Sequence, residues 1–254
     1  RQALVALADP ADPVTAELFQ YRFGGLGELG GHAVGNVVLT GLAAILGDPV
    51  AALDRAAVML GCCGRVLPMA AEPLEIEAEV VGLDPRDPGA PTAVRGQHRV
   101  ATTPGHVRRV SLHPVEPAAC PEAVAAVADA DTLVFGPGSW FTSVIPHFLV
   151  PDLRDAIAKS PARKVLVLNL STDGETDGWP IEGHLDALAA HAPAVTFDTV
   201  LADPGVVRDH QRLSRAAESL GGGLVVTPFA LGDGSPRHDQ AALAAALRTA
   251  LGID

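Results

Sequence analysis

One stretch of the chain combines glycines with hydroxyl side chains, at a point where a strand would give way to a helix. Its members are Gly136, Gly138, Ser139, Thr142 and Ser143, and the run just before them is apolar. Glycine lets a ligand approach the backbone closely, and the free N–H groups at a helix start attract anions. The stretch therefore predicts a site for a phosphate or carboxylate group, with a serine-capped tight turn as the alternative.

Two common catalytic motifs do not fit this stretch. No Gly-Lys-Ser or Gly-Lys-Thr follows it, which excludes a Walker A loop. Phe141 stands where the Gly-x-Ser-x-Gly nucleophile elbow has its last glycine. Since no nucleophile–base pair can be read from the rest of the chain either, we expect no catalytic residue and favour a binding site.

Two further polar loops follow apolar runs later in the chain. One contains Asn169, Thr176 and Asp177, and the other leads from Gly232 to Arg237. Because the carboxyl ends of neighbouring parallel strands face one crevice, we expect all three loops to converge on a single site. Arg237 is predicted to bind a phosphate group there through two hydrogen bonds.

Other polar residues near these loops have simpler explanations. Two interpretations of Asp177 are open. Together with Glu175 it would hold a metal or act as an acid–base pair, or it would cap a helix whose first turn carries Pro180. We favour the cap. Asp239 is expected to cap the last helix, and His238 is equally well explained by a structural or a functional role.

Near the other end of the chain, His32 and Asn36 flank the start of a helix beginning at Ala33. Asparagine is a poor helix former, so Asn36 is expected to be kept for a contact, and both residues are candidate ligand-binding residues. The three cysteines lack metal-site spacing, and no metal or cofactor is expected. We interpret seven remaining histidines as surface or satisfied polar residues: those at 98, 106, 113, 147, 184, 191 and 210.

The second half of the chain alternates between strand and helix patterns, which predicts an α/β fold with a parallel sheet. The run Lys164–Leu168 is apolar without interruption beyond its first residue, as expected for a strand covered by helices on both faces. Strands are predicted near 131–135, 164–169, 196–201 and 223–227, with helices near 143–158, 181–190, 206–219 and 239–250.

The first half is predicted to be helical up to a β-rich excursion near residues 65–113. Helices are expected at 15–23, from Ala33 to Leu46, and from Asp48-Pro49 through Leu60. Within the excursion, alternating residues predict a strand around Leu74–Val80, and further strands are expected near 92–103 and 107–113. We interpret residues 1–254 as a single domain whose natural chain extends further toward the N-terminus, because Arg1 begins in a helical pattern without a cap.

Composition narrows the function classes. The net charge of −12 argues against a nucleic-acid surface. No apolar run is long enough to span a membrane and no signal peptide opens the chain, so a cytoplasmic protein is expected.

Six ordered motifs together resemble the YvcK family of bacterial gluconeogenesis factors, relatives of the phospholactate transferase CofD. They cover essentially the whole chain: Leu18–Phe23, Gly31–Asn36, Arg65–Pro68, Gly136–Pro146, Gly174–Gly178 and Arg237–Asp239. The family also has a glycine-rich loop and an Asp-Asp-Gly-Gly segment that would lie upstream of Arg1.

The resemblance implies a Rossmann-like fold that binds UDP-N-acetylglucosamine or a related nucleotide sugar. It further implies a regulatory role in cell-wall growth and cell shape on gluconeogenic carbon sources, in a homo-oligomer with the cell-wall synthesis machinery as a partner.

Two alternatives stay open. The first is a CofD-like 2-phospho-L-lactate transferase of coenzyme F420 biosynthesis, although Gly138-Ser139-Trp140 follows the YvcK pattern rather than the CofD one. The second is a structural partner of the cell-wall machinery with a vestigial crevice.

Overall fold

A computed structural model describes residues 1–25, 27–172, 176 and 178–253 of the chain. The chain divides into two compact units, residues Arg1–Pro68 and Met69–Asp254, which are described separately below. That residues 1–254 form one domain stays a prediction.

The first unit is helical, as its sequence predicts. Its helices are α1 (Gln2–Ala6), α2 (Pro13–Gln20), α3 (Val34–Leu46) and α4 (Pro49–Met59). Asp12 caps α2 by accepting the Thr15 N–H, and Asp48 caps α4 in the same way at the Val50 and Ala51 N–H groups. A small core of Leu4, Phe19, Ala56 and Leu60 holds these helices together.

The second unit begins with a three-stranded antiparallel sheet in the order β2-β1-β3. Its strands are β1 (Glu75–Val81), β2 (Thr92–Arg95) and β3 (His106–His113). The predicted strand at 92–103 is wrong in its second half, where α5 (Gln97–Ala101) forms instead. Gly96 has a φ of +98°, which ends the extended backbone of β2 and lets the chain turn into this short helix.

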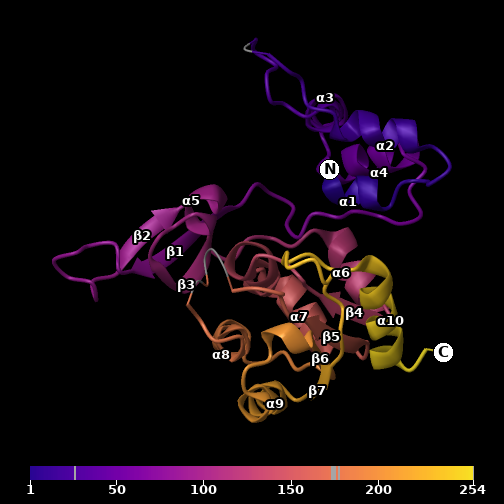
Figure 1. The fold of residues 1–254 in the computed structure, drawn as a ribbon. Coiled ribbons are helices and arrows are strands. Elements are labelled where there is room, and N and C mark those ends of the chain that lie inside the picture. The colour runs from indigo at the N-terminus through magenta and orange to yellow at the C-terminus, as the bar shows by residue number, and fades with distance from the viewer. Residues whose placement is uncertain (26, 173–175, 177, 254) are drawn as a thin grey trace. The chain divides into compact units, whose positions relative to one another are not determined.

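The rest of the second unit is the predicted α/β layer structure (Figure 1). Four parallel strands lie in the order β4-β5-β6-β7, namely β4 (Thr132–Phe135), β5 (Arg163–Val167), β6 (Thr199–Ala202) and β7 (Gly223–Val226). The helices are α6 (Pro121–Asp129), α7 (Pro151–Lys159), α8 (Glu182–His191), α9 (His210–Ser219) and α10 (Gln240–Leu251), with 3-10 turns at η2 (Ile145–Leu149) and η3 (Pro204–Val206).

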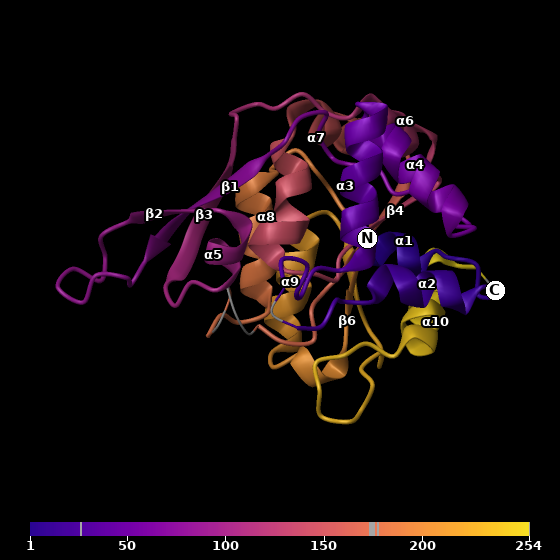
Figure 2. The same ribbon diagram turned by 90° about the horizontal axis from the view of Figure 1, so that it is seen from above.

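Helices cover both faces of this sheet, as predicted. Side chains of α7, α8 and α9 pack with Leu166 and Val200 on one face. Val165, Val167 and Leu201 point to the other face, where they pack against α10. In the view turned by 90°, α10 and α8 lie apart with β6 between them (Figure 2).

The single long helix predicted at 143–158 is wrong. The chain instead makes a π-helical turn, η1 (Trp140–Val144), then the 3-10 turn η2, and starts α7 only at Pro151. Pro146 and Pro151 explain the interruption, because proline has no N–H to donate and its ring collides with the preceding turn of a helix.

No described helix is both long enough and apolar enough to cross a membrane.

Candidate functional site

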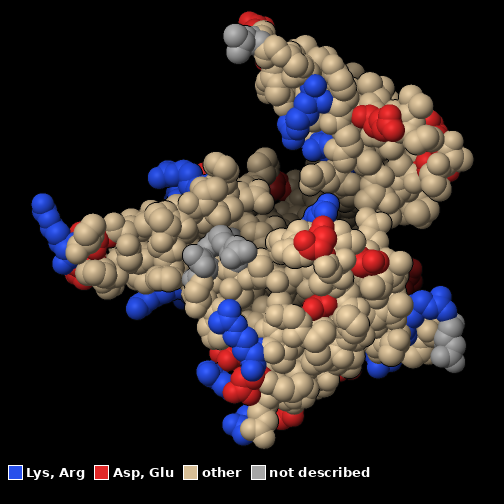
Figure 3. Space-filling model, viewed as in Figure 1, with Lys and Arg blue, Asp and Glu red and all other residues tan. Residues whose placement is uncertain are grey.

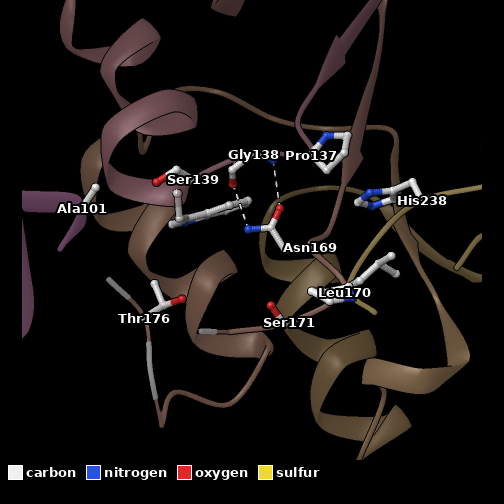
Figure 4. A pocket seen from close by; sticks show the side chains of 11 residues that line it. Ala101, Pro137, Gly138, Ser139, Asn169, Leu170, Ser171, Thr176 and His238 are labelled. Carbon is white, nitrogen blue, oxygen red and sulfur yellow. Dashed lines mark hydrogen bonds between the residues drawn. The ribbon is translucent and has the colours of Figure 1, made fainter. Parts of the chain in front are cut away.

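A cavity of about 390 Å³ lies at the carboxyl ends of the parallel strands. All three loops that the sequence predicts to converge contribute to it, together with the end of α5 (Figure 4). Its lining consists of Ala101, Pro137, Gly138, Ser139, Trp140, Asn169, Leu170, Ser171, Thr176, Pro236 and His238. Four of the predicted site residues, Gly138, Ser139, Asn169 and Thr176, therefore line this one cavity.

The loop after β4 owes its course to Gly136. This residue has a φ of +73°, and a Cβ built on it would come within 2.7 Å of the Val167 carbonyl oxygen on β5. A side chain is therefore excluded both by backbone conformation and by space. Gly136 brings the chain tightly past β5, so that Gly138 and Ser139 reach the cavity.

Asn169 holds this loop from the end of β5. Its Nδ2 donates to the Gly138 carbonyl oxygen at 2.8 Å, and its Oδ1 accepts the Gly138 N–H at 2.9 Å (Figure 4). The Gly138 N–H, which the sequence suggested for an anion, is thus already donated to Asn169. Asn169 lines the cavity and also positions the loop.

The hydroxyl groups of the loop pair with each other. The Ser139 and Thr142 hydroxyl oxygens lie 2.6 Å apart, and the Thr142 carbonyl accepts from Gln97 Nε2 at 3.4 Å. Thr142 is buried and Ser143 is exposed, and neither lines the cavity. Ser143 donates its N–H to the Ser139 carbonyl, which starts η1.

Thr176 and Trp140 line the cavity and share one buried partner, His184. Its Nε2 lies 3.0 Å from the Thr176 hydroxyl oxygen, and its ring stacks on Trp140 with the ring centres 4.8 Å apart. Burial lowers the pKa of His184 to about 4, so the ring is neutral near pH 7. Interpreting His184 as a surface or satisfied residue was wrong, because it is 0% exposed and its Nδ1 has no described partner.

His238 reaches the cavity from the loop after β7 and faces Pro137 and Asn169 (Figure 4). Its ring stacks on Phe229 with the ring centres 5.7 Å apart. Burial lowers the pKa of His238, while Asp203 opposes that shift. The sequence left its role open, and the cavity now assigns it to the lining.

Asp203 anchors the segment on which His238 rests. Its carboxylate accepts the N–H groups of Phe229 at 2.7 Å and Ala230 at 2.8 Å. Burial alone would raise the pKa of Asp203, but the N–H donors of Phe229, Gly205 and Ala230 outweigh it and lower the pKa. No local pattern in the sequence indicates this role, because Asp203 accepts from residues 26 and 27 positions away.

Arg237 lies beside the cavity but does not line it. Its Nη2 forms an ion pair with Asp233 at 2.7 Å, and its Nε donates to the Ser235 hydroxyl oxygen at 3.0 Å. Hydrogen bonds from Ser235 and then from Arg237 lower the pKa of Asp233 to about 2. The loop therefore holds Arg237 by itself, and its binding of phosphate stays a prediction.

The remaining candidates have the following places. His32 and Asn36 belong to the first unit, where His32 is exposed and Asn36 Oδ1 accepts from Arg1 Nε at 3.1 Å. Asp177, like Glu175, lies outside the described residues. The helix that Asp177 was expected to cap starts later than predicted, with Ile181 as its N-cap. Asp239 does cap the last helix, by accepting the Ala242 N–H at 3.0 Å.

Unsatisfied polar groups gather around the cavity. Among the described residues, four buried side-chain nitrogens lack a hydrogen-bond partner: Trp140 Nε1, His184 Nδ1, His238 Nε2 and Arg1 Nη1. Three of the four belong to side chains that line the cavity or lie directly behind its lining. Such groups are rare in native proteins and cost free energy, so their concentration at one place marks a site.

The cavity lining is polar but uncharged. No Lys, Arg, Asp or Glu occurs among the described lining residues. Charged side chains gather elsewhere in mixed groups, for example over α9, where Arg212 pairs with Glu182 at 3.2 Å (Figure 3). No three His, Cys, Asp or Glu side chains within the described parts of the chain are grouped as metal ligands would be.

Comparison with known proteins identifies the family. The family described as 2-phospho-L-lactate transferase CofD matches residues 1–221. The chain belongs to the CofD family. Within it, the relatives are gluconeogenesis factors, as the motifs indicated.

A Mycobacterium tuberculosis protein that carries the gluconeogenesis-factor name is 48% identical to this CofD-family chain over 253 residues, covering 97% of the chain and 73% of that protein. The gluconeogenesis factor of Halalkalibacterium halodurans is 34% identical over 219 residues, or 86% of the chain and 65% of that protein. The crystal structure of protein BH3568 from Bacillus halodurans matches with a TM-score of 0.83 at 30% identity, covering 96% of the chain and 80% of that structure.

Proposed function

We propose that this CofD-family protein binds a nucleotide sugar, UDP-N-acetylglucosamine, in the cavity at the carboxyl ends of the parallel strands. The observation that carries the proposal is the concentration of unpartnered buried polar atoms on Trp140, His184 and His238. Trp140 and His238 line the cavity, so a polar ligand bound there is placed to partner their nitrogens, while His184 lies directly behind the lining. The cavity also has the size and the mixed lining of a small-molecule site.

The chemistry of the lining suits the sugar better than the diphosphate. Hydroxyl, amide and imidazole groups line it, and no charged side chain does so among its described members. Sugar hydroxyls and an N-acetyl group are neutral donors and acceptors, which such a lining matches. Arg237, one residue from His238 in sequence, supplies the cation that the phosphate groups require.

The cellular role follows from the family rather than from the cavity. We propose a regulatory protein required for cell-wall growth and cell shape under gluconeogenic conditions, which acts in the cytoplasm as a homo-oligomer with the cell-wall synthesis machinery. Support comes from the relatives named gluconeogenesis factors. Light scattering of the purified protein tests the oligomer, and growth of a deletion strain on gluconeogenic and glycolytic carbon sources tests the role.

Calorimetric titration of the purified protein with UDP-N-acetylglucosamine tests the proposed ligand. We expect saturable binding, with weaker binding of UDP and of N-acetylglucosamine alone, because each contains only part of the ligand. Absence of binding by all three compounds would contradict the proposal.

A second function has one observation in its favour, the matching family described as 2-phospho-L-lactate transferase CofD. A transferase would join a phospholactyl group to a deazaflavin. Incubation with both substrates and a divalent cation tests it, and turnover at enzymatic rates would favour this function over a purely regulatory one.

A further inference from the structure

His184 is the one buried residue that contacts two separate parts of the cavity lining among the contacts described above. It belongs to α8, it is 0% exposed, and it does not line the cavity itself. Trp140 comes from the turn after β4, and Thr176 comes from the loop between β5 and α8. The His184 ring, which lies behind the lining, therefore contacts two separate segments of the chain: the turn after β4 and the loop between β5 and α8.

The direction of the His184–Thr176 hydrogen bond follows from the proton count. The Thr176 hydroxyl donates its only proton to the Thr172 carbonyl oxygen, 3.0 Å away. It must therefore accept from His184, whose Nε2 carries the proton. A neutral imidazole has one N–H, so Nδ1 is the bare nitrogen, and it has no described partner.

Trp140 contacts His184 in a different way, through ring stacking. It is 1% exposed, and its Nε1–H has no described hydrogen-bond partner that would fix the indole plane. The nearly parallel His184 ring, at an interplanar angle of 18°, lies against that plane. Both cavity side chains thus contact the same imidazole.

We propose that His184 is a positioning residue, which turns the Thr176 hydroxyl into an obligatory acceptor for a donor group of the bound sugar and holds the Trp140 ring in place. This inference rests on the proposed function. Thr176 has one oxygen lone pair left after its bonds to Thr172 and His184, and no proton left to give. A sugar hydroxyl or the N–H of an N-acetyl group can donate to it, whereas a fully ionised phosphate oxygen cannot.

Two substitutions separate the two contacts of His184. His184→Phe keeps a ring against Trp140 but removes the donor to Thr176, and His184→Gln keeps an N–H donor but removes the ring. Calorimetric titration with UDP-N-acetylglucosamine and with UDP measures both. We expect His184→Phe to weaken UDP-N-acetylglucosamine binding about fivefold, the effect of losing one oriented hydrogen bond, and to leave UDP binding unchanged. His184→Gln should recover most of that loss.

Thr176→Val gives a second test if His184→Phe does not fold by circular dichroism. It should cause the same selective loss, and the double variant should lose no more than either single one, because both remove one interaction. His191→Gln is the matched control. His191 lies on the same helix, and its Nε2 accepts the Val110 N–H at 3.2 Å, away from the cavity lining.

The outcomes are distinguishable. A parent protein that binds neither UDP-N-acetylglucosamine nor UDP overturns the proposed function and this inference with it. A parent that binds both, with equal losses for the two ligands in Thr176→Val or no loss in either variant, overturns the role of His184 alone. A selective loss for the sugar-bearing ligand supports it.

Discussion

The two sheets of the second unit each carry a cavity, and the larger one has the weaker claim to function. The cavity on the open face of the antiparallel sheet measures about 470 Å³ and includes Glu77, Glu79 and Arg109. Its neighbours satisfy one another: Arg95 pairs with Glu77 at 2.8 Å, and His113 lies 3.5 Å from the same carboxylate. Around the smaller cavity, by contrast, Trp140, His184 and His238 all have unpartnered nitrogens.

The two cavities thus differ in whether their buried polar atoms have partners, and the larger and more charged one is not the one with unpartnered nitrogens. The open face follows from the alternation of Glu75, Glu77 and Glu79 with buried residues, which is the ordinary pattern of a half-exposed strand. Its ion pairs are solvated and stabilise the fold little. Around the strand-end cavity, buried polar groups are kept out of water without a partner, which costs free energy and is the basis of the proposed ligand site.

The largest effect is expected from Gly136→Ala, in the loop beside the strand-end cavity, and it concerns the free energy of unfolding. The new Cβ would meet the Val167 carbonyl oxygen at 2.7 Å with the backbone at a φ of +73°. We expect a loss of roughly 2–4 kcal/mol in the free energy of unfolding, from backbone strain and overpacking together. Urea unfolding measures it. Gly138→Ala is the control, since its Cβ would lie 3.7 Å from Ser143 Cβ, and equal losses in both variants would contradict the assigned role of Gly136.

The second effect is a pH dependence that His184 should confer. Its pKa is about 4 in the folded protein and near 6.5 when unfolded, so between these values the unfolded chain binds more protons. Stability should therefore fall as the pH falls through this range, by about 2 kcal/mol from pH 7 to pH 5 for this group alone. The lowered pKa values of His191 and His238 act in the same direction.

His184→Gln removes the titrating group and should reduce the pH dependence by that amount. Urea unfolding of the parent and the variant at pH 7 and pH 5 gives the comparison. His210→Gln, at an exposed histidine, is the control. Equal slopes for the parent and His184→Gln would show that His184 does not remain neutral when buried.

Local signals in the sequence were sufficient for the sheet and for the glycine loop. The apolar run ending at Leu168 reveals a strand covered on both faces, and Gly136 stands where the chain must pass β5. Even the break in the predicted helix at 143–158 has a local cause in Pro146 and Pro151. These features depend on residues that are close together in the sequence, so the sequence alone is sufficient to predict them.

The site's supporting contacts were not predictable in the same way. Asn169 bonds to Gly138 across 31 positions, and the buried ring of His184 stacks on Trp140, which lies far earlier in the chain. A histidine on a helix looks the same in the sequence whether it is exposed or buried. Only packing decides, and packing is set by residues distant in the chain.

The third prediction concerns Arg237 as the positive charge that binds the ligand's phosphate groups, since no charged side chain occurs among the described lining residues. We expect Arg237→Ala to weaken UDP-N-acetylglucosamine binding at least about tenfold, because a charge-assisted hydrogen bond to phosphate is lost. The melting temperature should change little, since Arg237 bonds only within its own exposed loop in the described contacts. Arg248→Ala, at an exposed arginine of α10, is the control. Unchanged affinity in Arg237→Ala would leave Arg237 as a loop-stabilising residue.

The smallest effect is expected on the open face of the antiparallel sheet. Arg95→Ala removes the partner of Glu77, whose pKa is lowered first of all by its hydrogen bond to Arg95. Because this pair is solvent-exposed, the melting temperature should fall only slightly, and the affinity for UDP-N-acetylglucosamine should stay that of the parent. Calorimetric titration and thermal unfolding of the variant measure the two quantities. If Arg95→Ala lost as much affinity as Arg237→Ala, the ligand would have to bind the paired charges of the open face, and unpartnered polar atoms would no longer distinguish the two cavities.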